Sequence, residues 1–66
     1  MNIKQVRERL KKIEEVKSDC ESAHSYEDGM WRAVLQAIAN GEAEDPAALA
    51  RECLKSEDID FERWFA

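Results

Sequence analysis

Three side chains that can bind metal ions or move protons lie close together in the sequence. His24, Glu27 and Asp28 are spaced i, i+3 and i+4, so on a helix they would share one patch. Helical bundles use such spacings in metal centres, but those centres also draw carboxylates from other helices. No second motif of this kind occurs here. We predict that the three residues are structural, and a metal-dependent hydrolase centred on His24 is our third hypothesis.

The two cysteines offer another candidate for metal binding. Cys20 precedes His24 by four residues, and Cys53 could join them from another helix as a third zinc ligand. A structural zinc site usually has four ligands, commonly from paired spacings such as C-x-x-C, and this sequence has none. Free cysteine is also among the most often buried residue types. We predict free thiols in the core, no bound metal and no other cofactor.

Further signatures of catalysis are missing from the sequence. There is one histidine, and the two glycines cannot build a phosphate-binding loop. Neither a G-x-S-x-G nor a Walker pattern occurs. The sequence therefore predicts a protein that is not an enzyme and that has no catalytic residues.

Charge is distributed unevenly along the 66 residues. The formal net charge is −5, yet residues 1–17 carry +3 and residues 18–66 carry −8. An acidic total disfavours general DNA binding, because attraction to phosphates supplies most non-specific affinity. A basic ridge near the N-terminus could still contact an acidic partner or nucleic acid, and it consists of Lys4, Arg7 and Lys11.

A first helix is predicted over about residues 3–17. Its apolar side chains follow one face at spacings of three and four, and they are Ile3, Val6, Leu10 and Ile13. A chain this short has a small core, and natural chains of its size often depend on a disulfide, a metal or a second subunit. We therefore predict a homodimer that associates through this stripe.

A longer second helix is predicted over about residues 19–40. Ser18 is the expected N-cap, with Glu21 completing a capping box, and Ser25 is an alternative start. Gly41 suits the left-handed position just beyond the helix end. If the helix begins at the first start, one broad face of it consists of Cys20, Ala23, His24, Glu27, Met30, Trp31, Val34, Leu35 and Ile38.

A third helix over about 46–55 completes the predicted bundle. Asp45 is the expected N-cap, and Pro46 suits the first helical position, where its missing N–H has no partner. A short helical turn at 61–65 is expected to plug the open end of the bundle with large apolar side chains. Short connections favour antiparallel neighbours. The predicted fold class is all-α, a three-helix antiparallel arrangement forming one domain over residues 1–66.

The predicted location is cytoplasmic, without contact to a membrane. No uninterrupted apolar run approaches the roughly 20 residues that a membrane-spanning helix requires. Nothing at the N-terminus combines a basic segment, an apolar segment and a cleavage site.

Three stretches carry a resemblance to a known group of proteins, namely AHSYEDGMWRAVLQAIANG, DPAALARECLKS and IDFERWFA. In this order they resemble small uncharacterised helical proteins encoded in bacteriophages and prophages, and the likeness covers about residues 19–66. The resemblance implies a bacterial cytoplasmic setting and an accessory role, and it carries no catalytic signature.

The predicted function is a non-enzymatic protein-interaction module, a phage-derived modulator of a host protein that uses its acidic surface for complementarity. The alternative is a regulatory protein that contacts nucleic acid through the basic first helix. The C-terminal Arg63, Trp64 and Phe65 have the composition of an interface anchor, but we expect the rings to complete the core.

Overall fold

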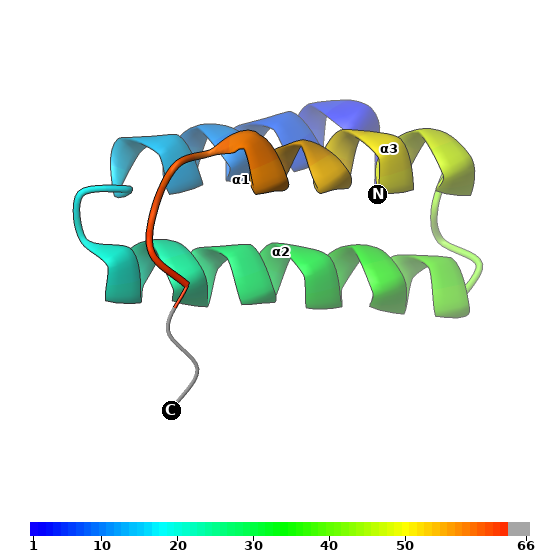
Figure 1. Ribbon diagram of the computed structural model, residues 1–66. Coiled ribbons are helices and arrows are strands. Elements are labelled where there is room, and N and C mark those ends of the chain that lie inside the picture. Colours follow the sequence, from blue (N-terminus) through cyan, green and yellow to red (C-terminus); the bar gives the residue numbers. More distant parts are fainter. Residues whose placement is uncertain (64–66) are drawn as a thin grey trace.

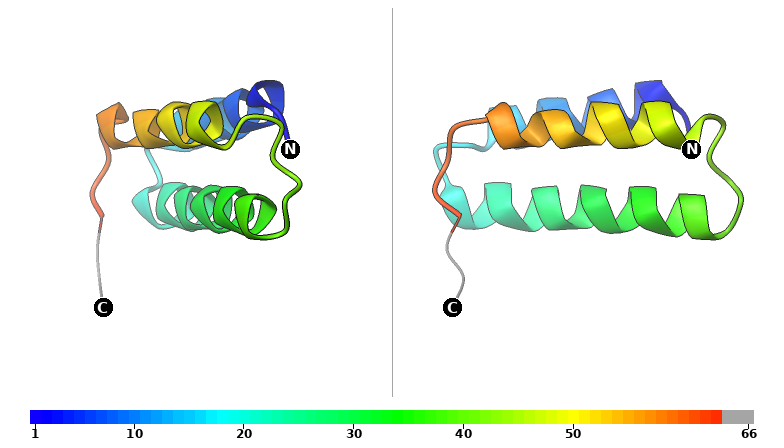
Figure 2. Two further views of the ribbon diagram at one scale, coloured as in Figure 1. Left: turned by 90° about the vertical axis from the view of Figure 1, so that its right-hand side faces the viewer. Right: turned by 45° about the vertical axis from the view of Figure 1, so that its right-hand side comes forward.

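The computed structural model describes residues 1–63 as three helices in two layers. α1 (Ile3–Glu15), α2 (Cys20–Ala39) and α3 (Pro46–Leu54) are followed by a 3-10 turn, η1 (Lys55–Asp58). α1 and α3 lie side by side over α2 (Figures 1 and 2). Each helix runs antiparallel to the one before it, so α1 and α3 run in the same direction (Figure 1). The predicted all-α, three-helix fold with a short C-terminal helical turn is confirmed.

Side-chain caps define the first turns of α1 and α2. At α1, the side chain of Asn2 accepts from the Gln5 N–H at 3.0 Å, and Gln5 Oε1 accepts from the Asn2 N–H at 2.9 Å. At α2, Asp19 is the N-cap and accepts from the Ser22 N–H at 3.2 Å. The prediction of Ser18 as N-cap was therefore wrong by one residue.

The start of α2 at Cys20 decides between the two predicted starts in favour of the earlier one, and the alternative at Ser25 was wrong. The carboxylate of Asp19 satisfies a free N–H of the first turn and places negative charge at the positive end of the helix dipole. Serine at the preceding position offers only a neutral hydroxyl.

The end of α2 is a Schellman motif, and Gly41 occupies its left-handed position as predicted, with φ of 70°. The Gly41 N–H donates to the Ile38 carbonyl at 3.1 Å, and the Glu42 N–H donates to the Ala37 carbonyl at 2.8 Å. These two bonds satisfy carbonyls that the helix end leaves without partners. The amino group of Met1 donates to the Glu42 carbonyl at 2.6 Å, which holds the start of α1 against this loop.

α3 begins as predicted, with Pro46 in its first turn and Asp45 accepting from the Ala48 N–H at 3.1 Å. The C-terminal helical turn is η1, which directly continues α3 and lies earlier than the predicted 61–65. Residues 61–63 are not helical, and Trp64 and Phe65 lie outside the described residues.

The apolar stripe of α1 is buried inside the chain. Val6 and Ile13 have no exposed surface, while Ile3 and Leu10 pack against the core from its edge. α2 and α3 both pack on α1, and their buried core residues are Ala23, Met30, Val34, Leu49 and Cys53. This corrects the basis of the predicted dimer interface, because the rest of the chain covers the stripe and leaves Val6 and Ile13 no surface to offer a second subunit. Self-association remains a prediction.

No helix within residues 1–63 is both long enough and apolar enough to cross a membrane.

Candidate functional site

His24, Glu27 and Asp28 lie on α2 as predicted, and they line one hollow of about 230 Å³ together with Trp31, Glu57 and Arg63. His24 Nε2 lies 3.4 Å from Asp28 Oδ2. Both carboxylate oxygens of Glu27 instead accept hydrogen bonds from Arg63, at 2.9 and 3.0 Å. This bidentate pair engages the oxygens that a metal ion would need. In the described part of the chain, no group of three or more His, Cys, Asp or Glu residues could hold a metal ion.

The two cysteines are free thiols, as predicted. Cys53 is buried in the core, as predicted, whereas the same prediction was wrong for Cys20, which is half-buried and is not part of the core cluster. Burial raises the pKa of the Cys53 thiol, and the charge of Glu27 raises it further. Because the thiolate is the reactive form, Cys53 is poorly suited to nucleophilic chemistry.

A buried polar network ties the C-terminal segment to α2. Its four members are Glu27, Trp31, Ser56 and Arg63, and we call them the Glu27 network. Glu27 exposes 7% of its surface and Ser56 none. The indole N–H of Trp31 donates to Ser56 Oγ at 3.0 Å, and Arg63 donates to the Ser56 carbonyl at 2.9 Å. Arg63 also donates to the carbonyls of Ile59 and Phe61.

Opposing effects act on the Glu27 carboxyl. Burial raises its pKa, but the hydrogen bonds from Arg63 and Ser56 and the charge of Arg63 lower it more, so the net shift of the pKa is downward. Glu27 is therefore ionised in the folded protein at neutral pH. It acts as a structural anion that holds Arg63 in place, and it is not suited to act as a general base.

An apolar groove lies between α2 and α3, beside the Glu27 network. We call it the α2/α3 groove, and its lining residues are Trp31, Val34, Leu35, Ile38, Ala50, Cys53 and Leu54. It encloses about 200 Å³. Leu35 is 64% exposed, Leu54 48% and Trp31 36%. The broad face predicted for this helix included Trp31 and Leu35, and the structure leaves both side chains exposed.

Two arginines lie near the α2/α3 groove. Arg32 lines a neighbouring hollow together with Asp28, Trp31 and Leu35. Arg51 is exposed on α3, one helical turn before Leu54. Residues 29–41 contain no acidic side chain. The charged side chains near the groove therefore include Arg32 with Asp28 on α2 and Arg51 on α3.

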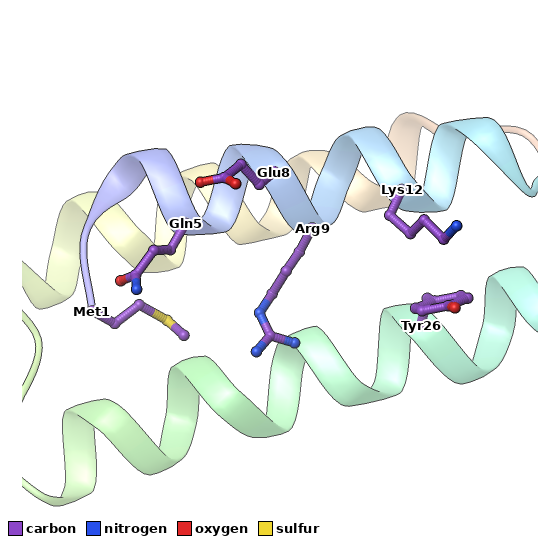
Figure 3. A pocket seen from close by; sticks show the side chains of 6 residues that line it. All are labelled: Met1, Gln5, Glu8, Arg9, Lys12 and Tyr26. Atoms are coloured by element: carbon purple, nitrogen blue, oxygen red, sulfur yellow. The ribbon is translucent and has the colours of Figure 1, made fainter.

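A larger hollow of about 440 Å³ lies between α1 and α2 (Figure 3). We call it the α1/α2 hollow, and it is lined by Met1, Gln5, Glu8, Arg9, Lys12 and Tyr26. Arg9 extends from α1 toward α2, and Lys12 lies above the Tyr26 ring (Figure 3). The Lys12 ammonium is 5.5 Å from the centre of that ring. Neither Arg9 nor Tyr26 was recognised as a site residue from the sequence.

The predicted basic ridge lies exposed on α1, but only part of its charge is available. The guanidinium of Arg7 lies 3.3 Å from Glu52 Oε1 on α3. Lys55 also pairs with Glu52, at 2.6 Å. Among residues 1–63, Lys4 and Lys11 have no acidic partner. Arg7 is therefore paired within the fold, whereas Lys4 and Lys11 are exposed to solvent.

Comparison with protein-family models, with curated proteins and with solved structures finds no match to this chain. The resemblance to phage and prophage proteins, with the cytoplasmic setting that it implies, therefore stays a prediction. Because one fold can serve many functions, the three-helix fold alone does not identify the function.

Proposed function

We propose that this protein is a non-enzymatic interaction module that binds an amphipathic helix of a partner protein in the α2/α3 groove. The observation that carries the proposal is the exposure of Leu35 and Leu54 on two packed helices, on either side of an apolar hollow. Two neighbouring helices form a groove into which a third helix can place one apolar face.

The size and lining of the groove favour a protein side chain over a small molecule. Its volume of about 200 Å³ lies below the roughly 300–1,000 Å³ of typical small-molecule sites. The lining is almost wholly apolar, and the indole N–H of Trp31 is already donated to Ser56. The groove thus has room for one or two apolar side chains and little to orient a polar ligand.

The rim charges define the chemistry of the partner helix. Arg32 lines the hollow next to the groove, and Arg51 follows the groove residue Ala50 on α3. An amphipathic helix that carries Asp or Glu beside its apolar face would complement these two arginines. Such rim charges contribute mainly to the association rate and to the choice of partner.

The test uses a synthetic helical peptide with leucines spaced to share one face and glutamates on both flanks. A matched peptide carries lysines in place of the glutamates. Each is titrated into isotope-labelled protein and followed by NMR. We expect the acidic peptide to bind more tightly, with the largest shifts at the amides of Trp31, Leu35 and Leu54.

Two variants locate the binding surface. Leu35→Glu places a charge in the groove and should abolish binding. Ser25→Glu adds the same charge at an exposed position of α2 outside the groove and should preserve it.

Three outcomes would contradict the proposal. The first is equal binding of the two peptides, and the second is shifts confined to α1. The third is a dimer, seen by sedimentation velocity, that Leu35→Glu disrupts, because the occupant of the groove would then be a second copy of this chain.

A further inference from the structure

We propose that the α1/α2 hollow binds a small phosphorylated molecule, held by Arg9 and Lys12 beside the ring of Tyr26. This site lies on the opposite side of α2 from the α2/α3 groove and does not depend on the function proposed above.

The hollow contains two cations that have no ion-pair partner. Within residues 1–63, neither Arg9 nor Lys12 forms an ion pair, whereas Arg7 pairs with Glu52 on the same helix's other flank. Glu8 also lines the hollow, but its carboxylate points away from the Arg9 guanidinium (Figure 3). The lining side chains therefore carry one positive charge in excess, in a protein whose net charge is −5.

These side chains match the chemistry of a phosphoryl group. The planar guanidinium of Arg9 can donate two parallel hydrogen bonds to phosphoryl oxygens, and Lys12 adds a compact charge. Tyr26 is 47% exposed and lines the hollow, so its side chain is accessible to a ligand there. A tetrahedral phosphoryl group can use donors from three directions, whereas a planar carboxylate uses chiefly the guanidinium fork.

The volume of this hollow also distinguishes it from the α2/α3 groove. Its volume of about 440 Å³ falls within the roughly 300–1,000 Å³ that small-molecule sites occupy. Arg9 and Lys12 stand three residues apart on α1, and both side chains line the hollow from one helix. The site requires no movement of α1 relative to α2.

The experiment titrates inorganic pyrophosphate, a nucleoside diphosphate and citrate into the protein by calorimetry, with NMR to locate the contacts. We expect pyrophosphate to bind and to shift the amides of Arg9, Lys12 and Tyr26, and citrate to bind more weakly. Tighter binding of the nucleoside diphosphate, lost in Tyr26→Ala, would identify a nucleotide as the source of the phosphoryl group. Equal binding of the two phosphates would identify the phosphoryl group alone.

A matched pair of double variants separates a site from general attraction to a basic helix. Arg9→Gln with Lys12→Gln should lower pyrophosphate affinity by about tenfold or more, the effect of losing charge-assisted hydrogen bonds. Lys4→Gln with Lys11→Gln removes the same charge from the solvent-facing side of α1 and should change the affinity by less than about twofold. All four side chains are exposed, so both variants should fold.

Three results would overturn the proposal: no binding of pyrophosphate, citrate binding as tightly as pyrophosphate, or equal losses in the two double variants. The last result would assign the affinity to the overall charge of α1.

Discussion

The two sides of α2 belong to one helix yet differ in chemistry, because one side is apolar and the other is charged. Toward α3, Trp31 and Leu35 line an apolar groove, whereas toward α1, Tyr26 lies beneath the ammonium of Lys12. The difference comes from the neighbouring helices. α3 leaves Leu54 exposed at its edge with α2, while α1 buries its apolar stripe and places charged side chains such as Arg9 at its edge. The ligand that each side can bind is therefore set as much by the adjacent helix as by α2.

The largest expected effect comes from breaking the Glu27 network, which supports only the groove side. Glu27→Gln leaves the Arg63 guanidinium without its anion at a mostly buried position and should lower the free energy of unfolding by about 2–3 kcal/mol. Urea denaturation measures this change. Asp28→Asn is the matched control, because Asp28 is exposed and its contact with His24 should be worth less than about 0.5 kcal/mol.

Glu27→Gln should also affect ligand binding differently on the two sides of α2. Through Ser56, the network holds the indole of Trp31, so loss of Glu27 should weaken peptide binding in the α2/α3 groove. Pyrophosphate binding in the α1/α2 hollow should be unchanged in the folded variant. Equal weakening of both ligands would show that the two surfaces are not independent.

An intermediate effect is expected on acidification. The pKa of Glu27 is lower in the folded protein than its ordinary value of 4.5, so the folded state releases this proton more readily than the unfolded state. The stability contributed by the ionised carboxylate is therefore complete above 4.5 and is lost as the pH falls through the lower folded value. Denaturation at a series of pH values should show that the free energy of unfolding decreases once the pH is below about 4.5.

The control for this pH dependence is again Glu27→Gln. Its stability should fall less steeply with acidification than that of the unaltered protein. It should not become flat, because hydrogen bonds also lower the pKa values of Asp19 and Glu52. Parallel curves for the two proteins would contradict the assignment of the pH effect to Glu27.

The smallest effect is a gain in stability that should leave both surfaces unchanged. Gly29 is exposed within α2, and a Cβ added there would meet no atom within 4 Å. Gly29→Ala should therefore raise the free energy of unfolding by about 0.5–1 kcal/mol, because alanine has the higher helix propensity. Thermal unfolding measures the gain. Altered binding of either ligand would indicate that α2 itself, and not its neighbours, controls the two surfaces.

Features that depend on a few adjacent residues were predictable from the sequence. The Schellman glycine, Gly41, and the capped start of α3 at Asp45 and Pro46 were placed correctly, because their hydrogen bonds join residues within one helical turn or its immediate continuation. The one-residue error at Ser18 arose because two adjacent side chains could both cap α2, and local spacing does not rank them.

The Glu27 network could not be predicted in this way. Arg63 lies 36 positions after Glu27. The segment after η1 returns toward α2 (Figure 1), and there the guanidinium donates to Glu27. From the sequence, Glu27 was grouped with His24 and Asp28 because those residues are its neighbours on the helix. The partner that binds both carboxylate oxygens of Glu27 is Arg63, which lies far away in the sequence.

The sequence by itself determined that the chain forms three helices, where most of them begin and end, and which side chains share each helical face. Only the tertiary structure decided which of those faces are covered. The stripe of Val6 and Ile13 is buried, while Leu35 and Leu54 remain exposed. Periodicity is a property of one helix, whereas burial depends on how distant helices pack against one another, so the exposed groove and the charged hollow emerge only in the folded chain.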